Sequence, residues 1–376
     1  MSKKRGNGEG GITRHKKSSL YMARYTVQSP TGTKRKTIYG KEREEVAEKL
    51  IEALSNRNKG LVFEGEDQTL SAYLDRWLNG SVKGSVKPST YESYERMIRN
   101  HIKPALGHRK VKNLAPDHVQ YFYEQKLDAG FASGTVRLMH GILHKALEQA
   151  VKWGIIPRNV CKAMTPPKPN PEEIHPLDAE QAKRILEVAC GNRLEALYVL
   201  AVTAGFRIGE LLGLKWEDMD LDAETLHVRR TKSQAKSGPT FTTPKSGKGR
   251  SIRLTQRAVE ALKSHKAVQN AERLKLGYLW ENNDLVFCTT AGKLLDFRNV
   301  ATASFKPLLK KAGLPDIRFH DLRHTCATLL LSRGHHPKLV QELMGHASVA
   351  MTLDRYSHVL PGMGEQTAAA MEAALS

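Results

Sequence analysis

The amino-acid sequence predicts a multidomain α+β protein. We expect a small N-terminal β-sheet with one helix, then an all-α region, and finally a mainly α-helical region that contains a small β-sheet. Two strand-like segments and one amphipathic segment fall within residues 1–60, whereas residues 68–165 show helical periodicity. The Pro-rich segment 165–174 has the composition of a stiff, extended linker and separates these regions from residues 175–376. A chain of 376 residues suits two or three domains, each with its own core.

The N-terminal region is expected to hold a basic hairpin and one helix. Residues 20–27 and 34–39 read as strands joined by a turn at 29–32, and residues 42–54 carry apolar side chains at helical spacing. The second strand carries three candidate DNA contacts, Lys34, Arg35 and Lys36. A small sheet can enter a major groove and contact phosphates there. The alternative is an ordinary basic hairpin that faces solvent.

Residues 68–165 are expected to be all helical. Apolar side chains recur at helical spacing in four segments, 69–78, 88–99, 119–127 and 136–153. Most of these apolar side chains should form a core. Three basic side chains of this region are candidate DNA contacts, Lys87, Arg96 and Arg137. For each of them the alternative is a solvated surface position.

The charge of the chain points to a polyanionic partner. Lys and Arg number 59 against 39 Asp and Glu, which gives a formal net charge of +20. The simplest partner for such an excess is nucleic acid. A ribosomal or otherwise adhesive basic protein is the alternative, but such proteins rarely keep 40% hydrophobic residues over several hundred positions.

Cysteine spacing and hydropathy indicate the cellular compartment in which the protein is expected to act. The four cysteines lie far apart and form no Cys-x-x-Cys pair, so neither a Cys-rich zinc site nor a disulfide framework is expected. This usage fits a reducing cytoplasm. The basic N-terminus lacks the apolar stretch of a signal peptide, and no apolar run approaches the roughly 20 residues of a membrane span.

The first candidate for phosphate chemistry is Arg207. Residues 194–214 read as two helices broken at Ala204-Gly205, and Arg207 and Glu210 follow the break three positions apart, so they should share a helix face. A guanidinium is a planar fork that matches two phosphate oxygens. Glu210 would then position Arg207 or a neighbouring histidine. The alternative is an ordinary surface ion pair.

A basic turn follows further along the chain. Residues 225–230 read as a strand, and residues 243–254 read as a turn and a second strand. Three basic side chains in or next to this turn could anchor phosphate groups, Lys245, Lys248 and Arg250.

Histidines and a second arginine cluster near the C-terminus. The segment 320–324 reads His-Asp-Leu-Arg-His, so His320 and Arg323 should share a helix face, and His346 follows Gly345. His320 and His324 could also suggest a zinc helix. That pattern requires Glu directly after the first histidine, where this chain has Asp, and no acidic third ligand stands out. We therefore expect no metal and interpret His324 as a structural histidine.

Tyr356 is the candidate nucleophile. A tyrosine hydroxyl can attack phosphorus if nearby cations overcome its high pKa. Tyr356 lies in the polar context Asp-Arg-Tyr-Ser-His, whose charges predict an exposed side chain. Tyr198 and Tyr278 are alternatives by residue type alone.

These residues, in this order, resemble the active site of the tyrosine recombinases, the lambda-integrase-like family. The resemblance covers nearly the whole chain. The N-terminal sheet and helix resemble the arm-binding domain of phage integrases, and residues 87–91 and 153–159 resemble parts of the core-binding domain. Residues 175–376 would then be the catalytic domain.

The resemblance implies a role for each phosphate ligand. Arg207 and Arg323 would hold the non-bridging oxygens of the scissile phosphate and stabilise the negative charge that develops during attack. His320 would assist proton transfer or donate a hydrogen bond. His346 would donate to the same phosphate.

The resemblance also implies a nucleophile and a general acid. Tyr356 would attack a phosphodiester, form a 3′-phosphotyrosyl link and free a 5′ hydroxyl. Lys245, in a Pro-Lys-Ser turn, would protonate the departing 5′ oxygen. Lys248 competes for that role.

The expected protein is an integrase of a phage or mobile element that needs no cofactor and no metal. Its partners would be double-stranded DNA attachment sites and three further copies in a homotetramer, with a host DNA-bending protein and a directionality factor as further partners. It would act in the bacterial cytoplasm at the nucleoid. The alternatives are a chromosome-dimer-resolving recombinase, a type IB topoisomerase-like enzyme, and a non-enzymatic DNA-binding protein.

The end of the chain is expected to be a separate helix. Residues 361–364 break the chain, and residues 365–375 read as an Ala-rich amphipathic helix. In the tyrosine recombinases such a tail docks on a neighbouring protomer. The alternative is packing against its own domain.

Overall fold

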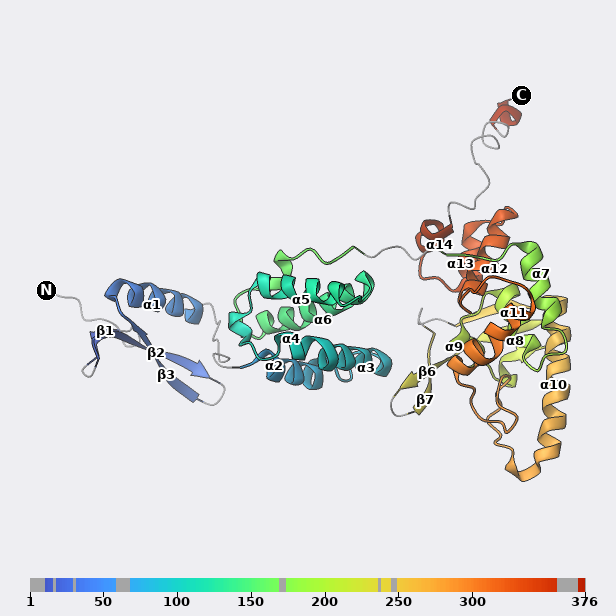
Figure 1. Cartoon of the computed structure of the whole chain (residues 1–376), viewed down its shortest axis with the longest axis horizontal. Helices are drawn as coiled ribbons and strands as arrows, with labels where there is room; N and C mark the ends of the chain where they lie inside the picture. The colour runs from blue at the N-terminus through green and yellow to red at the C-terminus, as the bar shows by residue number, and fades with distance from the viewer. Residues whose placement is uncertain are drawn as a thin grey trace. The chain divides into compact units, whose positions relative to one another are not determined.

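The protein is described by a computed structural model that covers residues 11–15, 18–29, 32–58, 68–168, 174–235, 238–244, 249–356 and 371–375. The chain divides into two compact units, Met1–Pro171 and Glu172–Ser376. Both units are mainly helical, and the strand pairs of the described residues are all antiparallel (Figure 1). The predicted fold class is therefore confirmed.

The first unit opens with a three-stranded sheet and one helix. Its elements in chain order are β1 (Gly11–Arg14), β2 (Tyr21–Ser29), β3 (Gly32–Gly40) and α1 (Arg43–Asn58). The central strand β2 pairs with both neighbours, and α1 buries Val46 and Leu50 against Ala23 of β2. Two strands and the helix were predicted, but β1 was not, because its four residues show no clear alternation. Part of the predicted turn lies outside the described residues.

The first unit continues with an all-helical bundle. Its α-helices are α2 (Leu70–Trp77), α3 (Pro88–Met97), α4 (Lys103–Leu106), α5 (Pro116–Asp128) and α6 (Ser133–Lys152). Four of them agree with the predicted segments. Thr69 caps α2 by accepting a hydrogen bond from the Ala72 backbone N–H. The long helix α6 supplies much of the core, and its Ala146 carbonyl accepts the buried hydroxyl of Tyr73 at 2.6 Å.

The second unit is built around one buried helix. Its helices are α7 (Ala179–Val188), α8 (Glu195–Ala204), α9 (Ile208–Leu211), α10 (Gln256–Leu276), α11 (Lys306–Lys311), α12 (Asp321–Ser332), α13 (Pro337–Met344) and α14 (Val349–Tyr356). Helix α8 is apolar on nearly all sides, as a helix inside a core must be, and it contacts α7, α10 and α12. It ends at Gly205, so the predicted helix break is where the structure has it.

The strands of the second unit differ from the expected simple hairpin. They are β4 (Met219–Asp220), β5 (Thr225–Val228), β6 (Thr231–Ala235), β7 (Gly238–Thr242) and β8 (Arg250–Arg253). Strand β5 does pair with β8, with Val228 opposite Arg250. A second hairpin, β6–β7, is inserted between them, and Lys245 falls in the segment that joins β7 to β8. The sequence did not predict this insertion because its polar residues lack a clear alternating pattern.

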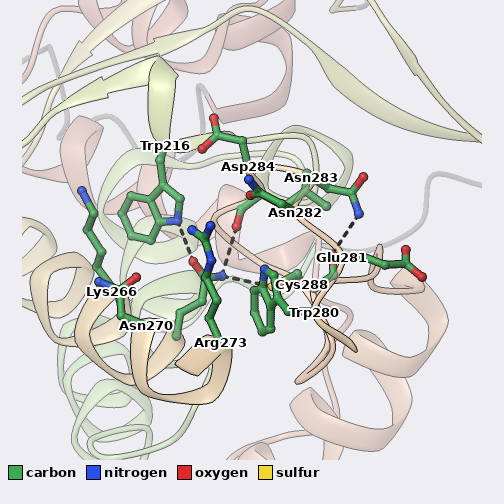
Figure 2. A pocket seen from close by; sticks show the side chains of 13 residues that line it. Trp216, Lys266, Asn270, Arg273, Trp280, Glu281, Asn282, Asn283, Asp284 and Cys288 are labelled. Carbon is green, nitrogen blue, oxygen red and sulfur yellow. Dashed lines mark hydrogen bonds between the residues drawn. The ribbon is translucent and has the colours of Figure 1, made fainter. Parts of the chain in front are cut away.

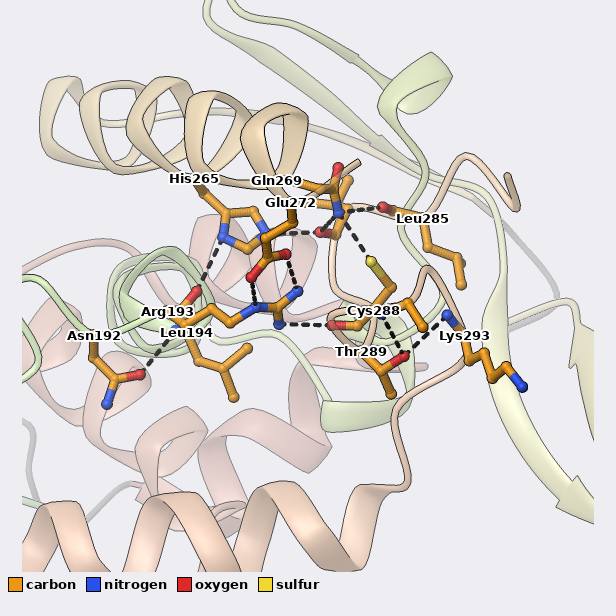
Figure 3. A network of polar contacts seen from close by, with 12 residues as sticks. Asn192, Arg193, Leu194, His265, Gln269, Glu272, Leu285, Cys288, Thr289 and Lys293 are labelled. Carbon is orange, nitrogen blue, oxygen red and sulfur yellow. Dashed lines mark hydrogen bonds and ion pairs between the residues drawn. The ribbon is translucent and has the colours of Figure 1, made fainter. Parts of the chain in front are cut away.

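A half-buried polar network ties α10 to the start of α8. The guanidinium of Arg193 donates to both carboxylate oxygens of Glu272, at 2.6 and 2.8 Å, and to the carbonyl of Cys288 at 2.7 Å (Figure 3). The fork geometry makes this a strong, directional contact. None of the candidate site residues takes part in these contacts, so the network stabilises the framework of the unit.

The end of the chain is described only in part. Residues 371–375 are helical, and Met371 and Leu375 are exposed. The rest of the predicted tail helix lies outside the described residues, so docking of the tail stays a prediction. None of the helices in the described ranges combines the length and apolar composition that crossing a membrane requires.

Candidate active site

Arg207 occupies the turn between α8 and α9. The structure places it at the residue before Ile208, with extended backbone, and not inside the helix as predicted. Its Nη1 donates to Oε1 of Glu210 at 2.9 Å, and Oε2 of the same carboxylate accepts the Arg207 backbone N–H at 3.1 Å. Glu210 therefore caps the short helix and orients the Arg207 side chain at the same time.

A second arginine, Arg250 of β8, holds Glu210 from another direction. Its Nη1 and Nη2 donate to the two carboxylate oxygens at 3.1 and 2.9 Å, and its Nε donates to the carbonyl of Leu343 at 2.9 Å. The Arg250 side chain is only 10% exposed. It was predicted as a DNA contact, but alternation along β8 puts it on the inner face with Ile252. Its guanidinium thus joins β8, α9 and α13.

The two arginines keep Glu210 ionised. Burial alone would raise the pKa of this carboxyl, but hydrogen bonds and positive charge from Arg250, together with Arg207, lower the pKa to about 2. The carboxylate is 1% exposed and carries one negative charge between two cations. Removing its charge would leave those cations uncompensated.

Replacing Glu210 by Gln should therefore weaken both the fold and the site. We expect Glu210→Gln to lower the free energy of unfolding by about 3–5 kcal/mol, because one partner of a buried ion pair is lost. We also expect slower DNA cleavage, because Arg207 loses the anion that orients it. Denaturant unfolding and a cleavage time course of the full chain measure the two effects.

The matched control is Glu217→Gln. Glu217 also pairs with an arginine, Arg230, but its side chain is 53% exposed. Its loss should cost under about 1 kcal/mol, as for other surface ion pairs. Equal losses of stability in the two variants would contradict the structural role given to Glu210.

Arg323 of α12 is buried beneath the ends of two other helices. It is 2% exposed, and its Nη1 and Nη2 donate to the carbonyls of Gly205 and Met344 at 2.7 and 2.5 Å. These carbonyls close α8 and α13, where backbone acceptors lack intrahelical partners and the helix dipole is negative. Burial, and then the charge of Arg207, lower the pKa of Arg323, yet the ordinary arginine pKa is high enough for the group to stay protonated.

Two glycines lie at the helix ends that Arg323 contacts. Gly205 and Gly345 end α8 and α13 with left-handed backbone, at φ values of 60° and 62°. A Cβ at Gly205 would lie 2.3 Å from Cε of Met344, and a Cβ at Gly345 would lie 3.0 Å from Nη1 of Arg250. The left-handed backbone favours glycine at both positions, and any side chain there would also have to displace Met344 or Arg250.

The histidines His320 and His346 lie in the field of the same arginines. His346 follows Gly345, and its Nδ1 makes a 2.8 Å hydrogen bond with the hydroxyl of the buried Thr352. Burial, then Arg323 and Arg207, lower the pKa of His346 to about 3. Partial burial, then Arg323 and Arg207, lower the pKa of His320 too. His346 is therefore neutral near neutral pH and can donate from only one ring nitrogen.

Tyr356 is buried, which contradicts the predicted exposed position. It is 2% exposed and packs against α12 and α13 in a cluster that includes Cys326 and Met344. The charged neighbours Asp354 and Arg355 do point to solvent, but Thr352 and Tyr356 are four positions apart and share the inner face of α14. The flanking charges therefore say nothing about the face on which the tyrosine lies.

The Tyr356 hydroxyl forms a hydrogen bond with His324, which the sequence predicted to be a structural histidine. Nδ1 of His324 lies 2.5 Å from the hydroxyl oxygen, and the His324 ring packs edge-on against His320, with centroids 5.1 Å apart. Burial raises the pKa of Tyr356 to about 12, against the opposing effect of Arg323 and Arg355. His324 lies four residues after His320, and this spacing was the sequence signal that could have placed His324 in the site.

The alternative tyrosines lie in different surroundings. Tyr198 is buried in α8, where its hydroxyl contacts the Ser304 hydroxyl at 2.6 Å. Tyr278 is 95% exposed beyond α10. No ion pair or hydrogen bond of the described residues joins either side chain to Arg207 or Arg323.

The remaining site predictions fall on the surface or outside the described residues. Lys245 and Lys248 lie outside them, as does the side chain of Lys34. The other predicted DNA contacts of the first unit are exposed, apart from the half-buried Lys36, and they are Arg35, Lys36, Lys87, Arg96 and Arg137. Nothing in their contacts distinguishes a DNA-binding position from a solvated one.

A cavity of about 220 Å³ lies elsewhere in the second unit. Trp216, with its ring N–H on Gln269, lies across it from Trp280, and Lys266 and Arg273 line the same space (Figure 2). None of the candidate site residues lines this cavity. Within the described ranges, no group of three or more His, Cys, Asp or Glu side chains is arranged to hold a metal ion.

Comparison with known proteins shows the family to which the chain belongs. Residues 175–362 match the phage integrase family, and residues 69–127 match the phage integrase N-terminal SAM-like domain. A XerC-like tyrosine recombinase of Caldanaerobacter subterraneus subsp. tengcongensis is 34% identical over 347 residues, which cover 87% of this chain and 88% of the relative.

Two solved structures show the fold. The Tn1549 transposon integrase in complex with transposon right end DNA has a TM-score of 0.69 at 21% identity, over 82% of this chain and all of that chain. A lambda integrase tetramer bound to a Holliday junction has a TM-score of 0.57 at 22% identity, over 90% of this chain and 95% of that chain.

A mainly helical fold that gathers arginines, histidines and a tyrosine in one cationic cluster defines a DNA breaking and rejoining enzyme. The chain belongs to the phage integrase family of tyrosine recombinases. It is a site-specific recombinase.

Proposed function

We propose that this recombinase integrates a phage or mobile element, and that it cuts attachment-site DNA with Tyr356 as the nucleophile. The observation that carries the proposal is the cluster in which α12 supplies Arg323, α14 supplies Tyr356, and the turn before α9 supplies Arg207. The charges of both arginines act on the same histidine, His346. A phosphate bound among these groups would meet cations and a hydroxyl in one place.

The arginines act on the scissile phosphate. Arg207 and Arg323 hold its non-bridging oxygens, and His320 and His346 donate further hydrogen bonds. The donors are held in place before DNA binds, because Glu210 orients Arg207 and helix ends hold Arg323. Such preorganised donors stabilise the charge that develops in the transition state.

Lys245 serves as the general acid for the 5′ oxygen, with Lys248 as the alternative. Both follow β7 and precede β8, and β8 is anchored to the site through Arg250. The start of β8, which follows both lysines in the sequence, therefore lies next to the catalytic cluster.

The reaction consists of two transesterifications on each strand. Tyr356 displaces the 5′ oxygen, and the 5′ hydroxyl of the partner strand later displaces Tyr356. Bond energy is kept in the phosphotyrosyl link, so no cofactor is required. Four copies exchanging strands between two duplexes fit this scheme, and lambda integrase is seen as a tetramer on a Holliday junction. A host DNA-bending protein, a directionality factor and action at the nucleoid complete the proposal.

The proposal is tested with a nicked duplex that carries the element's attachment site, which is found by sequencing the junctions of the integrated element. Cleavage beside the nick releases a short fragment that diffuses away, so the covalent complex accumulates. We expect a protein–DNA adduct on a denaturing gel, attached through a 3′ phosphate to Tyr356 in the mapped peptide. A chain that binds this duplex and forms no adduct would be a non-enzymatic DNA-binding protein.

We assign residues 1–60 to arm-type DNA binding, residues 68–165 to core-site binding and residues 175–376 to catalysis. The sheet and helix at the N-terminus support the first assignment, since a chromosome-dimer-resolving recombinase, suggested by the XerC-like relative, usually lacks such a domain. Residues 1–60 hold 15 Lys and Arg against 6 acidic residues.

Deletion of residues 1–60 should spare cleavage at the core site and weaken binding to a long attachment site. The truncated chain loses phosphate contacts, so the plot of log affinity against log salt should become less steep. Gel-shift titrations of the full and truncated chains at several salt concentrations measure the slope. An unchanged affinity and slope would favour the chromosome-resolving alternative.

A further inference from the structure

The hydroxyl of Tyr356 already has a proton acceptor beside it. Nδ1 of His324 lies 2.5 Å from the hydroxyl oxygen, and the two side chains are only 3% and 2% exposed. Among the described residues, His324 is the group hydrogen-bonded to this hydroxyl. The contact joins α12 to α14, so the helix that carries Arg323 also carries the partner of the tyrosine.

A phenol must lose its proton when its oxygen bonds to phosphorus. Burial makes the free phenolate scarce at Tyr356, since it raises the pKa to about 12. The other histidines of the site are less well placed to take this proton. Nδ1 of His346 is occupied by Thr352, and the described contacts of His320 include the His324 ring but no hydrogen bond to Tyr356.

The state of His324 suits an acceptor. Burial, and then the neighbouring His320, lower the pKa of His324 to about 4, so its ring is neutral near neutral pH. A neutral imidazole whose proton is on Nε2 accepts a hydrogen bond at Nδ1. The Tyr356 hydroxyl, which has one proton to give, is the donor in this pair.

We propose that His324 is a catalytic residue that takes the hydroxyl proton of Tyr356 as the tyrosine attacks, and returns it when the tyrosine leaves. The inference rests on the proposed role of Tyr356. In the forward step the O–H bond of Tyr356 breaks as an N–H bond forms on His324. The Oη–P bond then replaces the P–O5′ bond, and the 5′ oxygen receives its proton from a separate acid, proposed above to be Lys245. In the reverse step the phenolate oxygen leaves and recovers its proton from His324.

The test distinguishes the proposed general base, His324, from the proposed general acid, Lys245. His324→Gln keeps a hydrogen-bond acceptor near Tyr356 but cannot hold the proton. Each variant is given two nicked duplexes, one with an ordinary phosphodiester and one with a 5′-bridging sulfur, which leaves without protonation. Lys245→Ala should recover on the sulfur substrate. His324→Gln should form adduct about 10²–10⁴-fold more slowly than the unchanged chain on both substrates, the usual range for a lost general base.

The pH profile distinguishes proton acceptance from packing. On the sulfur substrate, the rate for His324→Gln should rise about tenfold per pH unit above neutrality, because hydroxide must then supply the phenolate. The unchanged chain should vary much less. Near-normal rates for His324→Gln, or a slow rate with the profile of the unchanged chain, would overturn the proposal.

Controls distinguish the loss of a proton acceptor from misfolding and from a wrong nucleophile assignment. Thermal melting and DNA binding show whether His324→Gln is folded, and His335→Ala, at an exposed histidine after α12, should behave like the unchanged chain. Adduct formation by Tyr356→Phe would instead refute the nucleophile assignment of the proposed function.

Discussion

Tyr356→Phe is expected to bind attachment-site DNA normally and to form no covalent adduct. The ring and its packing in the α12–α13 cluster are kept, and so are Arg207 and Arg323, the proposed phosphate ligands. Only the attacking oxygen is lost, so cleavage should fall to background on the ordinary and the sulfur-bridged duplex alike. Gel-shift titration and a denaturing gel of the same samples measure binding and chemistry.

Tyr198→Phe is the matched control for this variant. Each change removes one hydroxyl that is hydrogen-bonded inside the second unit, to His324 in one case and to Ser304 in the other. Each should therefore cost about 1 kcal/mol of unfolding free energy. Only Tyr356→Phe should lose the adduct. An adduct that persists in Tyr356→Phe would show that another residue is the nucleophile.

Arg323→Lys should produce the second large effect, on chemistry and stability together. Lysine keeps the charge but cannot donate to the carbonyls of Gly205 and Met344 and to a phosphate in the fork geometry of arginine. We expect cleavage to fall by about 10²–10³-fold, as when one donor to a developing charge is removed. An unpaired buried carbonyl should lower the free energy of unfolding by about 1–3 kcal/mol.

The control for Arg323→Lys is a half-buried arginine outside the site. Arg193→Lys loses the fork contact with Glu272 and the bond to the Cys288 carbonyl, so it should also be less stable. Measured at a temperature where both variants are folded, Arg193→Lys should still cleave DNA at a near-normal rate. If both variants lost cleavage equally, the defect of Arg323→Lys would be one of folding and not of phosphate binding.

The order of elements was readable because it depends on local patterns. Apolar spacing placed α2, α5 and α6, and the predicted break at Ala204-Gly205 placed the end of α8. The short strand β1 and the hairpin β6–β7 were missed, since neither contains enough alternating residues to give a period. Strand pairing across long separations in sequence, such as β5 with β8, was found only because both strands are regular.

The sequence by itself determined which residue types stand in the site and in what order, because motif spacing within one helix or turn is a local property. Only the tertiary structure decided what each side chain contacts. Arg250, predicted as a DNA contact, is a partner of Glu210, and Tyr356, predicted to be exposed, is buried. His324, interpreted as a structural residue, forms a hydrogen bond with the Tyr356 hydroxyl. In each case the deciding contact joins elements far apart in the chain. Burial, charge and hydrogen bonding depend on such contacts, which leave no trace in local spacing.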